Sequence, residues 1–196
     1  MKELQTIVLA SNNKHKLEEF RSMLKDYEIL SLRDIGFYDE IKEDGNSFEE
    51  NALIKAKTIS NYLKENNNDY IVIADDSGLC VPSLNSSPGI CSARYAGIGA
   101  TDRDNRNKLL KELKDKKREA YFNCTIIVYY PNCEYKVVEG IVNGRIIDKE
   151  EGTNGFGYDP IFYSTELGKT FGMSSSAEKN MVSHRARAIE KLLEIL

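Results

Sequence analysis

Residues 47–74 constrain the fold more than any other segment, because an amphipathic helix pattern runs directly into a buried strand pattern. Ser47, with Glu50 three residues later, has the form of a capping box. The apolar stripe of the helix consists of Ala52, Ala56, Ile59 and Leu63. A polar loop then leads to "YIVIA" (70–74), which has the composition of a strand. This order indicates an α/β or α+β protein with a partly parallel sheet.

The same alternation of strands and helices recurs along the chain. Residues 6–10 read as a short buried strand, and a helix follows it. A third helix is expected at 101–113, capped by Thr101 or Asp102. The chain closes with a helix at 183–196. The helix stripes consist of Leu17, Phe20 and Leu24 in the first helix and of Ile189, Leu192, Leu193 and Leu196 in the last.

Two β segments, 120–130 and 134–148, are predicted to form a hairpin through the turn "PNC". Asn143-Gly144 is an alternative position for a hairpin turn. A glycine-rich stretch, "EGTNGFGYDP", follows and leads into a short strand, "PIF".

The length, apolar content, net charge and cysteine count of the chain limit the classes of protein to which it can belong. At 196 residues, the chain has the size of one domain or of two small lobes that share a core. No apolar run is long enough to span a membrane, and the apolar part of "MKELQTIVLA" is too short for a signal peptide, so a cytoplasmic location is expected. The net charge of −4 argues against nucleic acid as a partner. Four cysteines without C-x-x-C spacing and only two histidines argue against structural zinc and for reduced thiols.

Asp75 and Asp76 stand directly after the apolar run "IVIA", where adjacent negative charges repel unless a cation lies nearby. Three interpretations are open: a turn, a metal site and a general base. Gly78 would allow a sharp turn after the strand. Adjacent side chains in an extended segment point to opposite faces, so only one carboxylate would face a given pocket. Ligands bind beyond the carboxyl ends of strands in open α/β sheets, which favours a functional role.

The segment "LASNNKHKLEEF" has the order strand, polar loop, helix, which offers backbone N–H groups and the positive end of a helix to an anion. Ser11 and Asn13 add side-chain donors, and Lys14 and Lys16 add positive charge. Together they predict a phosphate site that is not a P-loop, because the paired glycines are missing. A plain helix cap with surface lysines is the alternative.

Lys55 stands in line with the apolar face of its helix. Such a lysine either extends to water or reaches an anionic ligand. Glu43 and Asp44 precede the helix, where a carboxylate would join a metal site or simply favour the helix dipole. Spacing alone leaves both alternatives open.

The stretch "GTNGFGYDPIF" combines glycines with aromatic and acidic residues. Phe156 or Tyr158 would stack on a flat ring, and Asp159 would accept hydrogen bonds from ring nitrogens. An ordinary tight loop before a strand explains the same residues equally well.

"AEKNMVSHRARA" places basic residues where a helix disfavours them. Ser183 is a plausible cap, and His184 and Arg185 fall in the first turn, where the helix dipole opposes cations. Lys179 stands shortly before them. The unfavourable interaction of these cations with the helix dipole indicates an anionic or aromatic ligand nearby. A nucleoside triphosphate with Mg²⁺ would satisfy this signal and those above.

Six motifs follow one another in the chain: "SNNKHK", "FEENALIKA", "ADDSGL", "PGICSARYAG", "GFGYDPIF" and "SHRARA". In this order they resemble the inosine/xanthosine triphosphate pyrophosphatase family, from about residue 6 to the final helix. The resemblance implies one α/β domain over residues 1–196, with a long mixed β-sheet flanked by helices in two lobes and a central cleft. It also implies a homodimer and Mg²⁺-dependent hydrolysis of ITP, dITP and XTP to the monophosphate and pyrophosphate, which cleanses the nucleotide pool.

The resemblance also implies roles for individual residues. Asp76 would accept a proton and bind Mg²⁺, Glu43 would be the other metal ligand, and Ser77 would contact substrate. The general base is open between Asp75 and Asp76, because the two would titrate as a pair. The catalytic set comprises Asp75, Asp76, Lys16 and Lys55. The remaining substrate-binding residues are Ser11, Asn12, Asn13, Lys14, His15 and Lys16 at the triphosphate, and Phe156, Gly157, Tyr158, Asp159, Lys179, His184 and Arg185 around the base.

One departure from the family pattern concerns the metal. Many bacterial relatives have two acidic residues where this chain has Lys42-Glu43, which leaves Glu43 as the candidate ligand of that pair.

Three other functions are considered: a pyrophosphatase for modified pyrimidine nucleotides, a catalytically silent nucleotide sensor, and a nucleic-acid-binding protein. The purine motifs disfavour the pyrimidine pyrophosphatase, and the presence of Asp76 and Lys16 disfavours the silent sensor. The acidic net charge disfavours the nucleic-acid-binding protein.

Overall fold

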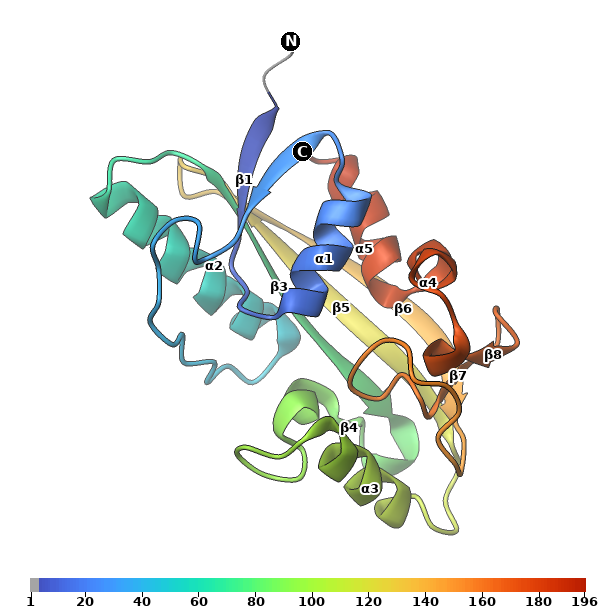
Figure 1. Cartoon of the computed structure of the whole chain (residues 1–196). Helices are drawn as coiled ribbons and strands as arrows, with labels where there is room; N and C mark the ends of the chain where they lie inside the picture. The colour runs from blue at the N-terminus through green and yellow to red at the C-terminus, as the bar shows by residue number, and fades with distance from the viewer. Residues whose placement is uncertain (1–3) are drawn as a thin grey trace. The chain divides into compact units, whose positions relative to one another are not determined.

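The computed structural model of the chain describes residues 4–196 (Figure 1). Its helices are α1 (Lys14–Met23), α2 (Phe48–Glu65), α3 (Asp102–Glu112), α4 (Ser176–Val182) and α5 (His184–Leu193). Its strands are β1 (Gln5–Leu9), β2 (Tyr27–Leu30), β3 (Ile71–Val81), β4 (Ser87–Pro88), β5 (Glu119–Tyr129), β6 (Tyr135–Ile146), β7 (Phe162–Ser164) and β8 (Lys169–Thr170). Within residues 4–196, no helix has the length and apolar character needed to cross a membrane.

The strands form a mixed sheet in the order β2-β1-β3-β5-β6-β7-β8, with β4 paired to β3. β1 is parallel to β2 and to β3. β4 is antiparallel to β3, and β7 is antiparallel to both β6 and β8. Parallel neighbours need crossover connections, and α1 and α2 lie in those that lead to β2 and β3. The predicted α/β class with a mixed, partly parallel sheet flanked by helices is therefore confirmed.

The chain divides into two compact units that share three strands. Unit 1 comprises the described residues up to Asp76, residues 125–139 and residues 188–196, and unit 2 comprises residues 77–124 and 140–187. β3, β5 and β6 each pass from one unit into the other. The prediction that the chain forms a single domain stays a prediction.

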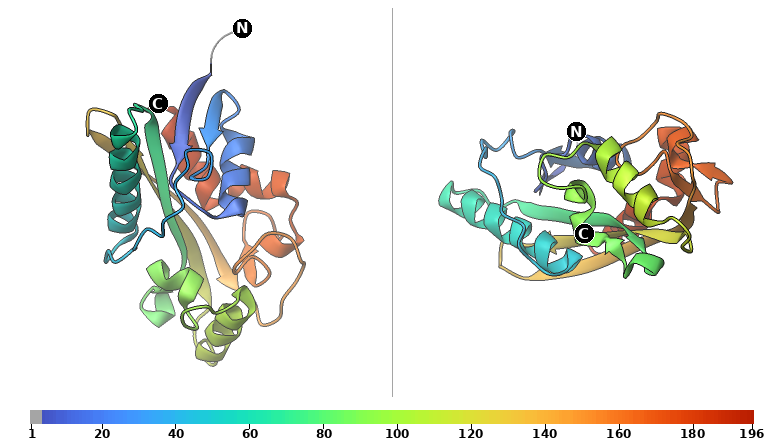
Figure 2. Two further views of the ribbon diagram at one scale, coloured as in Figure 1. Left: turned by 60° about the vertical axis from the view of Figure 1, so that its left-hand side comes forward. Right: turned by 90° about the horizontal axis from the view of Figure 1, so that it is seen from below.

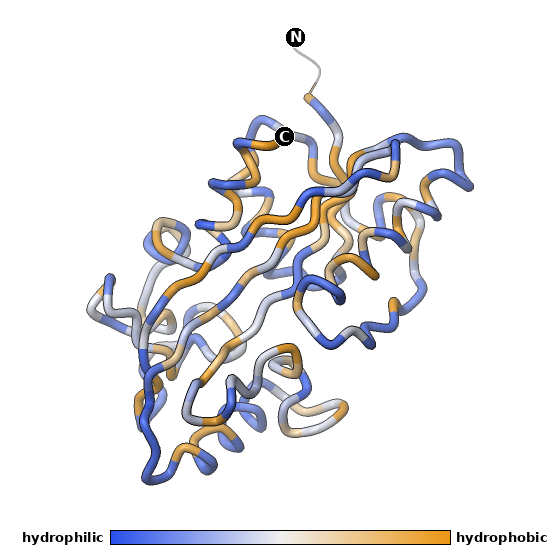
Figure 3. Tube along the Cα trace, turned by 180° about the vertical axis from the view of Figure 1, so that it is seen from behind, coloured by the Kyte–Doolittle hydropathy of each residue, from blue (hydrophilic) through white to orange (hydrophobic). Residues whose placement is uncertain are grey.

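Unit 1 is built around α2 and the strands it covers. α1 and α2 lie on opposite sides of these strands (Figure 2). Hydrophobic residues gather along the strands, whereas the connecting loops are largely hydrophilic (Figure 3). The buried cluster between α2 and the strands includes Ala52, Ala56, Ile59 and Leu63 of the predicted stripe and Val8, Val72 and Ala74 of the strands. The predicted stripe therefore faces the core.

The start of α2 agrees with the predicted cap. The hydroxyl of Ser47 accepts a hydrogen bond from the Glu50 amide at 3.1 Å. The Glu50 carboxylate reaches the amide of Asn46, one residue before the cap, at 2.6 Å. The cap is confirmed, although the reciprocal bond goes to the neighbouring amide.

Unit 2 has an aromatic core. The ring of Phe162 lies 4.7 Å from that of Phe122 and 5.1 Å from that of Phe171, between centroids. Leu109 of α3 and Tyr158 belong to the same buried cluster. The core therefore packs α3 against the segment that precedes β7, which contains the candidate residues for the base.

The strand predicted to end before the two aspartates continues through them. Asp75 and Asp76 lie within β3, so they are not beyond its carboxyl end. The turn considered at Gly78 is wrong as well, because Gly78 is a strand residue. A Cβ at this position would overlap the carbonyl oxygen of Gly89. Glycine is therefore needed for the close approach of another backbone segment.

The predicted hairpin between β5 and β6 is confirmed, since the Tyr130 amide donates to the Glu134 carbonyl at 2.9 Å across the turn. The alternative turn at Asn143-Gly144 is wrong. Both residues lie within β6, and Gly144 pairs with Ser164 of β7. A Cβ at Gly144 would overlap the Tyr163 carbonyl oxygen, so this glycine also permits a close approach.

The C-terminal helix is shorter than predicted. α5 ends at Leu193, which is 47% exposed, so the inner face of the helix is formed by Ile189 and Leu192.

β2 and α4 were not predicted. α4 begins with a capping box of Ser175 and Glu178, a signal that the sequence carries as S-x-x-E.

Candidate active site

Asp75 and Asp76 point to opposite faces of β3. Val72 and Ala74 pack with α2 in the core of unit 1, and the alternation of side chains along a strand places Asp76 on that same face. Their partners follow this division. Asp75 forms an ion pair with Lys16 of α1, and Asp76 contacts side chains of α2. Each carboxylate therefore has its own positively charged neighbour, which relieves the repulsion of the pair.

Asp76 is buried, at 8% exposure, among polar groups of α2. Its Oδ2 accepts a hydrogen bond from Asn51 Nδ2 at 3.1 Å, and its Oδ1 lies 3.9 Å from Lys55 Nζ. Burial raises the pKa of the Asp76 carboxyl, although the charges of Lys55 and Lys16 and the Asn51 hydrogen bond oppose this shift. A buried carboxylate with a raised pKa is suited to accepting a proton.

The Lys55 ammonium contacts several negative groups. It donates to Glu43 Oε2 and to the main-chain oxygen of Asp75, both at 2.8 Å. Burial lowers the pKa of Lys55, but the carboxylates of Asp76, Asp75 and Glu43 outweigh it, so this pKa lies above its ordinary value. The side chain does not extend to water, since Lys55 is 7% exposed. A charged ammonium is therefore held in the interior of unit 1.

Glu43 and Asp76 fit a Mg²⁺ ion. Both contribute carboxylate oxygens, and both lie beside the ammonium of Lys55, at 2.8 Å and 3.9 Å. Mg²⁺ in nucleotide sites takes one or two carboxylates and completes its shell with water and phosphate oxygens. Within residues 4–196, no group of three or more His, Cys, Asp or Glu side chains forms a metal centre by itself. Asp44, the other acidic candidate, is paired with Lys42 at the surface.

The N-terminus of α1 combines a cap with a lysine that turns inward. Asn13 Oδ1 accepts from the amides of His15 and Lys16 at 3.0 and 3.2 Å, and Ser11 Oγ accepts from the Asn13 amide. Lys16 Nζ lies 2.9 Å from Asp75 Oδ2, and the Asp75 side chain is fully buried. Residues 12–15 are exposed. A plain cap explains the Asn13 oxygen, but it does not explain a lysine paired with a buried aspartate.

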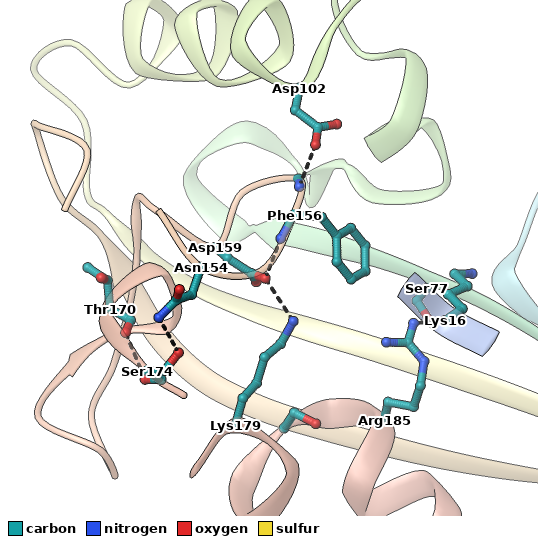
Figure 4. A network of polar contacts seen from close by, with 12 residues as sticks. Lys16, Ser77, Asp102, Asn154, Phe156, Asp159, Thr170, Ser174, Lys179 and Arg185 are labelled. Carbon is teal, nitrogen blue, oxygen red and sulfur yellow. Dashed lines mark hydrogen bonds and ion pairs between the residues drawn. The ribbon is translucent and has the colours of Figure 1, made fainter. Parts of the chain in front are cut away.

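In unit 2, Asp159 and Lys179 form a buried ion pair, with 2.7 Å between Nζ and Oδ2. The same oxygen accepts a hydrogen bond from the Phe156 amide at 2.9 Å (Figure 4). Lys179 Nζ also lies 4.8 Å from the centroid of the Phe156 ring. This Asp159 oxygen, predicted to bond a base, therefore holds the Phe156 loop and Lys179 together.

The two aromatic residues of this loop differ in surroundings. Tyr158 is 4% exposed, and its hydroxyl donates to the Ser92 carbonyl at 2.9 Å. Its ring belongs to the core of unit 2, so Phe156, which is half-buried, is the ring available for stacking. Gly157 has a φ of +59°, and its amide and carbonyl bond to side chains of α3.

The start of α5 holds the remaining predicted residues. Ser183 Oγ accepts a hydrogen bond from an amide of the first turn, which confirms the predicted cap. His184 and Arg185 are 5% and 1% exposed. The His184 ring stacks on Phe122 at 4.8 Å, and Arg185 Nη2 donates to Ser77 Oγ at 3.3 Å. Buried donor side chains thus lie at a helix end where the dipole disfavours positive charge.

Comparison with known proteins shows the family to which the chain belongs. A sequence model of the Ham1 family matches residues 7–195. The chain belongs to the Ham1 family. The dITP/XTP pyrophosphatase of Bacillus licheniformis is 48% identical to it over 198 residues, which cover 98% of each chain. The dITP/XTP pyrophosphatase of Clostridium perfringens is 47% identical over 199 residues, again 98% of each chain.

Solved structures of Ham1 proteins share the fold. The Ham1 protein of Staphylococcus aureus superposes with a TM-score of 0.85 at 43% identity and covers 97% of both chains. The HAM1 protein of Coxiella burnetii gives a TM-score of 0.87 at 38% identity and covers 98% of both. The likeness therefore extends over nearly the whole of this Ham1-family chain.

Sequence reasoning missed three polar residues of this Ham1 protein that contact candidate site residues, one in unit 1 and two in unit 2. Asn51, one helical turn before Lys55, is 1% exposed and bonds to Asp76; the helical spacing was the signal that could have found it. Asp102 and Arg106 of α3 bond to Gly157. Their partner stands far along the chain, so no local pattern indicated them.

Proposed function

We propose that the protein hydrolyses non-standard purine nucleoside triphosphates, namely ITP, dITP and XTP, to the nucleoside monophosphate and pyrophosphate. The observation that carries the proposal is the group of charges in unit 1, where the buried Asp76 lies beside Lys55 and Asn51 while Lys16 pairs with Asp75. The names of the B. licheniformis and C. perfringens proteins support the same activity. Its role would be to remove deaminated purine nucleotides from the nucleotide pool.

The triphosphate would bind at the N-terminus of α1. A helix N-terminus carries partial positive charge, and Lys14 and Lys16 in the first turn add full charges. Asn13 uses its carboxamide oxygen in the cap, so its NH₂ group is the donor that it would offer to phosphate. Lys16 would share its ammonium between the ligand and Asp75. Ser11, Asn12 and His15 complete the proposed phosphate-binding segment.

Mg²⁺ would be held by Glu43 and Asp76 together with oxygens of the substrate. When bound, the ion supplies positive charge that offsets the charge of the phosphate oxygens. Lys55 holds Glu43 and the backbone of Asp75 in place through its two 2.8 Å hydrogen bonds. Its own charge also favours the approach of an anionic substrate.

Asp76 would act as the proton acceptor. The oxygen of a water molecule forms a bond to the α-phosphorus, the water's proton passes to the Asp76 carboxylate, and the bond from the α-phosphorus to the bridging oxygen breaks. The electron pair of that bond leaves with pyrophosphate. Asp75 is fully buried against Lys16 at 2.9 Å, which suits it to orienting that lysine. The two aspartates would therefore have different roles.

The base would be selected in unit 2 by hydrogen-bond donors. Inosine and xanthine carry a 6-oxo group, whereas adenine carries an amine at this position. Lys179, His184 and Arg185 are donors that would bond an oxygen and leave the adenine amine without an acceptor. A buried mismatch of this kind costs roughly 1–3 kcal/mol. Phe156 would stack on the ring, Asp159 would hold Lys179 and Phe156 in place, and Ser77 would contact substrate beside Arg185.

We also propose a cytoplasmic homodimer, in line with the family resemblance. Light scattering on the purified protein would test the dimer, with an expected mass of twice the 22.2 kDa of the chain. A mass of one chain at micromolar concentration would contradict it.

The decisive experiment is turnover of ITP, XTP, ATP and GTP with Mg²⁺, with pyrophosphate and orthophosphate assayed separately. We expect pyrophosphate from ITP and XTP, little product from ATP, and loss of activity in Asp76→Asn. Removal of Mg²⁺ by a chelator should abolish turnover, and its return should restore it. Orthophosphate as the product would contradict the proposal, and so would tight ITP binding without turnover.

A further inference from the structure

α3 binds both polar groups of the peptide at Gly157, in the loop that carries Phe156. Asp102 Oδ2 accepts a hydrogen bond from the Gly157 amide at 2.7 Å. Arg106 Nη1 donates to the Gly157 carbonyl, also at 2.7 Å. Asp102 and Arg106 are one turn apart and therefore lie on the same face of α3. Both bonds have an ionised partner, which makes them stronger than ordinary amide hydrogen bonds.

Arg106 also ties this loop at a second point. Its Nε donates to Glu150 Oε1 at 2.8 Å, and its side chain is only 12% exposed. One guanidinium thus holds Glu150, directly before the glycine-rich stretch, and Gly157 within it. The start of α3 is itself fixed by a capping box of Thr101 and Asp104, so Asp102 is presented from a defined position.

The residues next to Gly157 are anchored as well. The Tyr158 hydroxyl bonds to the Ser92 carbonyl. Asp159 bonds to Lys179 of α4 (Figure 4). Asn105 of α3 accepts from the Ala96 amide at 2.7 Å, which ties α3 to the segment that contains Ser92. Successive residues 157–159 are therefore held from outside the loop. The backbone direction of the half-buried Phe156 is fixed as a consequence.

We propose that Asp102 and Arg106 are positioning residues that set base selectivity by holding Phe156 and the Lys179–Asp159 pair in one arrangement. The inference rests on the proposed function, because it assigns the Phe156 loop to the base. Selection between a 6-oxo and a 6-amino purine depends on donors placed to within a fraction of an ångström. A loop released from α3 would keep the stacking ring but lose that placement.

The test compares Arg106→Ala and Asp102→Ala with wild type in the full chain. Steady-state kinetics give kcat and KM for ITP and ATP, and calorimetry gives the affinity for inorganic tripolyphosphate, which has no base. We expect KM for ITP to rise about tenfold, as for the loss of a charge-assisted hydrogen bond, and the preference for ITP over ATP to fall by a similar factor. Tripolyphosphate affinity should stay at the wild-type value.

Two control variants sharpen the test. Arg103→Ala removes the same charge from an exposed position of α3 and should behave as wild type. Arg106→Lys retains a cation that can reach the Gly157 carbonyl and should restore most of the ITP preference. Unchanged ITP preference in both alanine variants would overturn the inference. A parallel loss of ITP and tripolyphosphate affinity would also overturn it, because that pattern reports general damage. Wild-type protein without ITP turnover would instead contradict the proposed function and, with it, this inference.

Discussion

Asn51 connects two parts of unit 1 through a single carboxamide. Its Nδ2 donates to Asp76 Oδ2 at 3.1 Å, and its Oδ1 accepts from the Gly45 amide at 2.9 Å. Gly45 belongs to the loop that carries Glu43, and Asn51 is 1% exposed. Both carboxylates proposed for Mg²⁺ therefore depend on this residue for their position, although it touches neither metal nor phosphate in the proposed mechanism.

Replacement of Asn51 by leucine keeps the approximate volume and removes both hydrogen bonds. We expect the free energy of unfolding to fall by about 1–3 kcal/mol, because buried polar groups lose their partners. We also expect kcat for ITP to fall about tenfold, because Asp76 loses the donor that orients it. Urea unfolding and steady-state kinetics measure the two effects. Asn61→Leu, at an exposed position of α2, is the matched control, and equal effects in both variants would contradict the prediction.

α4 is a short helix whose start depends on one carboxylate. Glu178 accepts from the amide and hydroxyl of Ser175 at 2.8 and 3.0 Å and from Lys169 Nζ at 2.7 Å. The hydrogen bonds from Lys169 and Ser175 lower the pKa of Glu178 from 4.5 to about 2. The helix carries Lys179, so its start also helps to place a candidate base-binding residue.

Because the pKa of Glu178 is lower in the folded protein, the ionised form stabilises the fold at neutral pH. This contribution is fully present above about pH 4.5 and is lost as the pH falls to about 2. Glu178→Gln should therefore have a lower Tm than wild type at pH 7, and the difference should shrink through that range. Thermal unfolding of both proteins from pH 7 to pH 2 checks this. A difference that stays constant with pH would contradict it.

Elements were predictable where their signals lie within one segment. The stripe of α2, the cap at Ser47 and the hairpin of β5 and β6 were all found from local patterns. The continuation of β3 beyond Ala74 was not found, because the charges of Asp75 and Asp76 are offset by Lys16 and Lys55, which come from other segments. Gly78 and Gly144 suggested turns, but both lie within strands. Each permits the close approach of another backbone segment, and the local sequence does not reveal that segment.

At the scale of the whole molecule, the order of six motifs implied two groups of candidate site residues, and their roles stay a prediction. The motif "ADDSGL" contributes to both, since Asp76 ends the first segment of unit 1 and Ser77 begins unit 2. The supporting residues Asp102 and Arg106 escaped prediction because only the folded chain brings α3 to Gly157.

Three strands shared by the two units predict a single cooperative unfolding transition. β3, β5 and β6 each supply residues to both units, so neither unit can lose them while the other keeps its sheet. Native-state hydrogen exchange in urea would compare amides of β1 in unit 1 with those of β7 in unit 2. We expect the same limiting free energy for both, and an equal rise of about 2.7 kcal/mol at a tripolyphosphate concentration of 100 Kd. The proposed contacts of tripolyphosphate lie in unit 1, so a rise confined to β1 would show that the units unfold separately and would contradict the single domain.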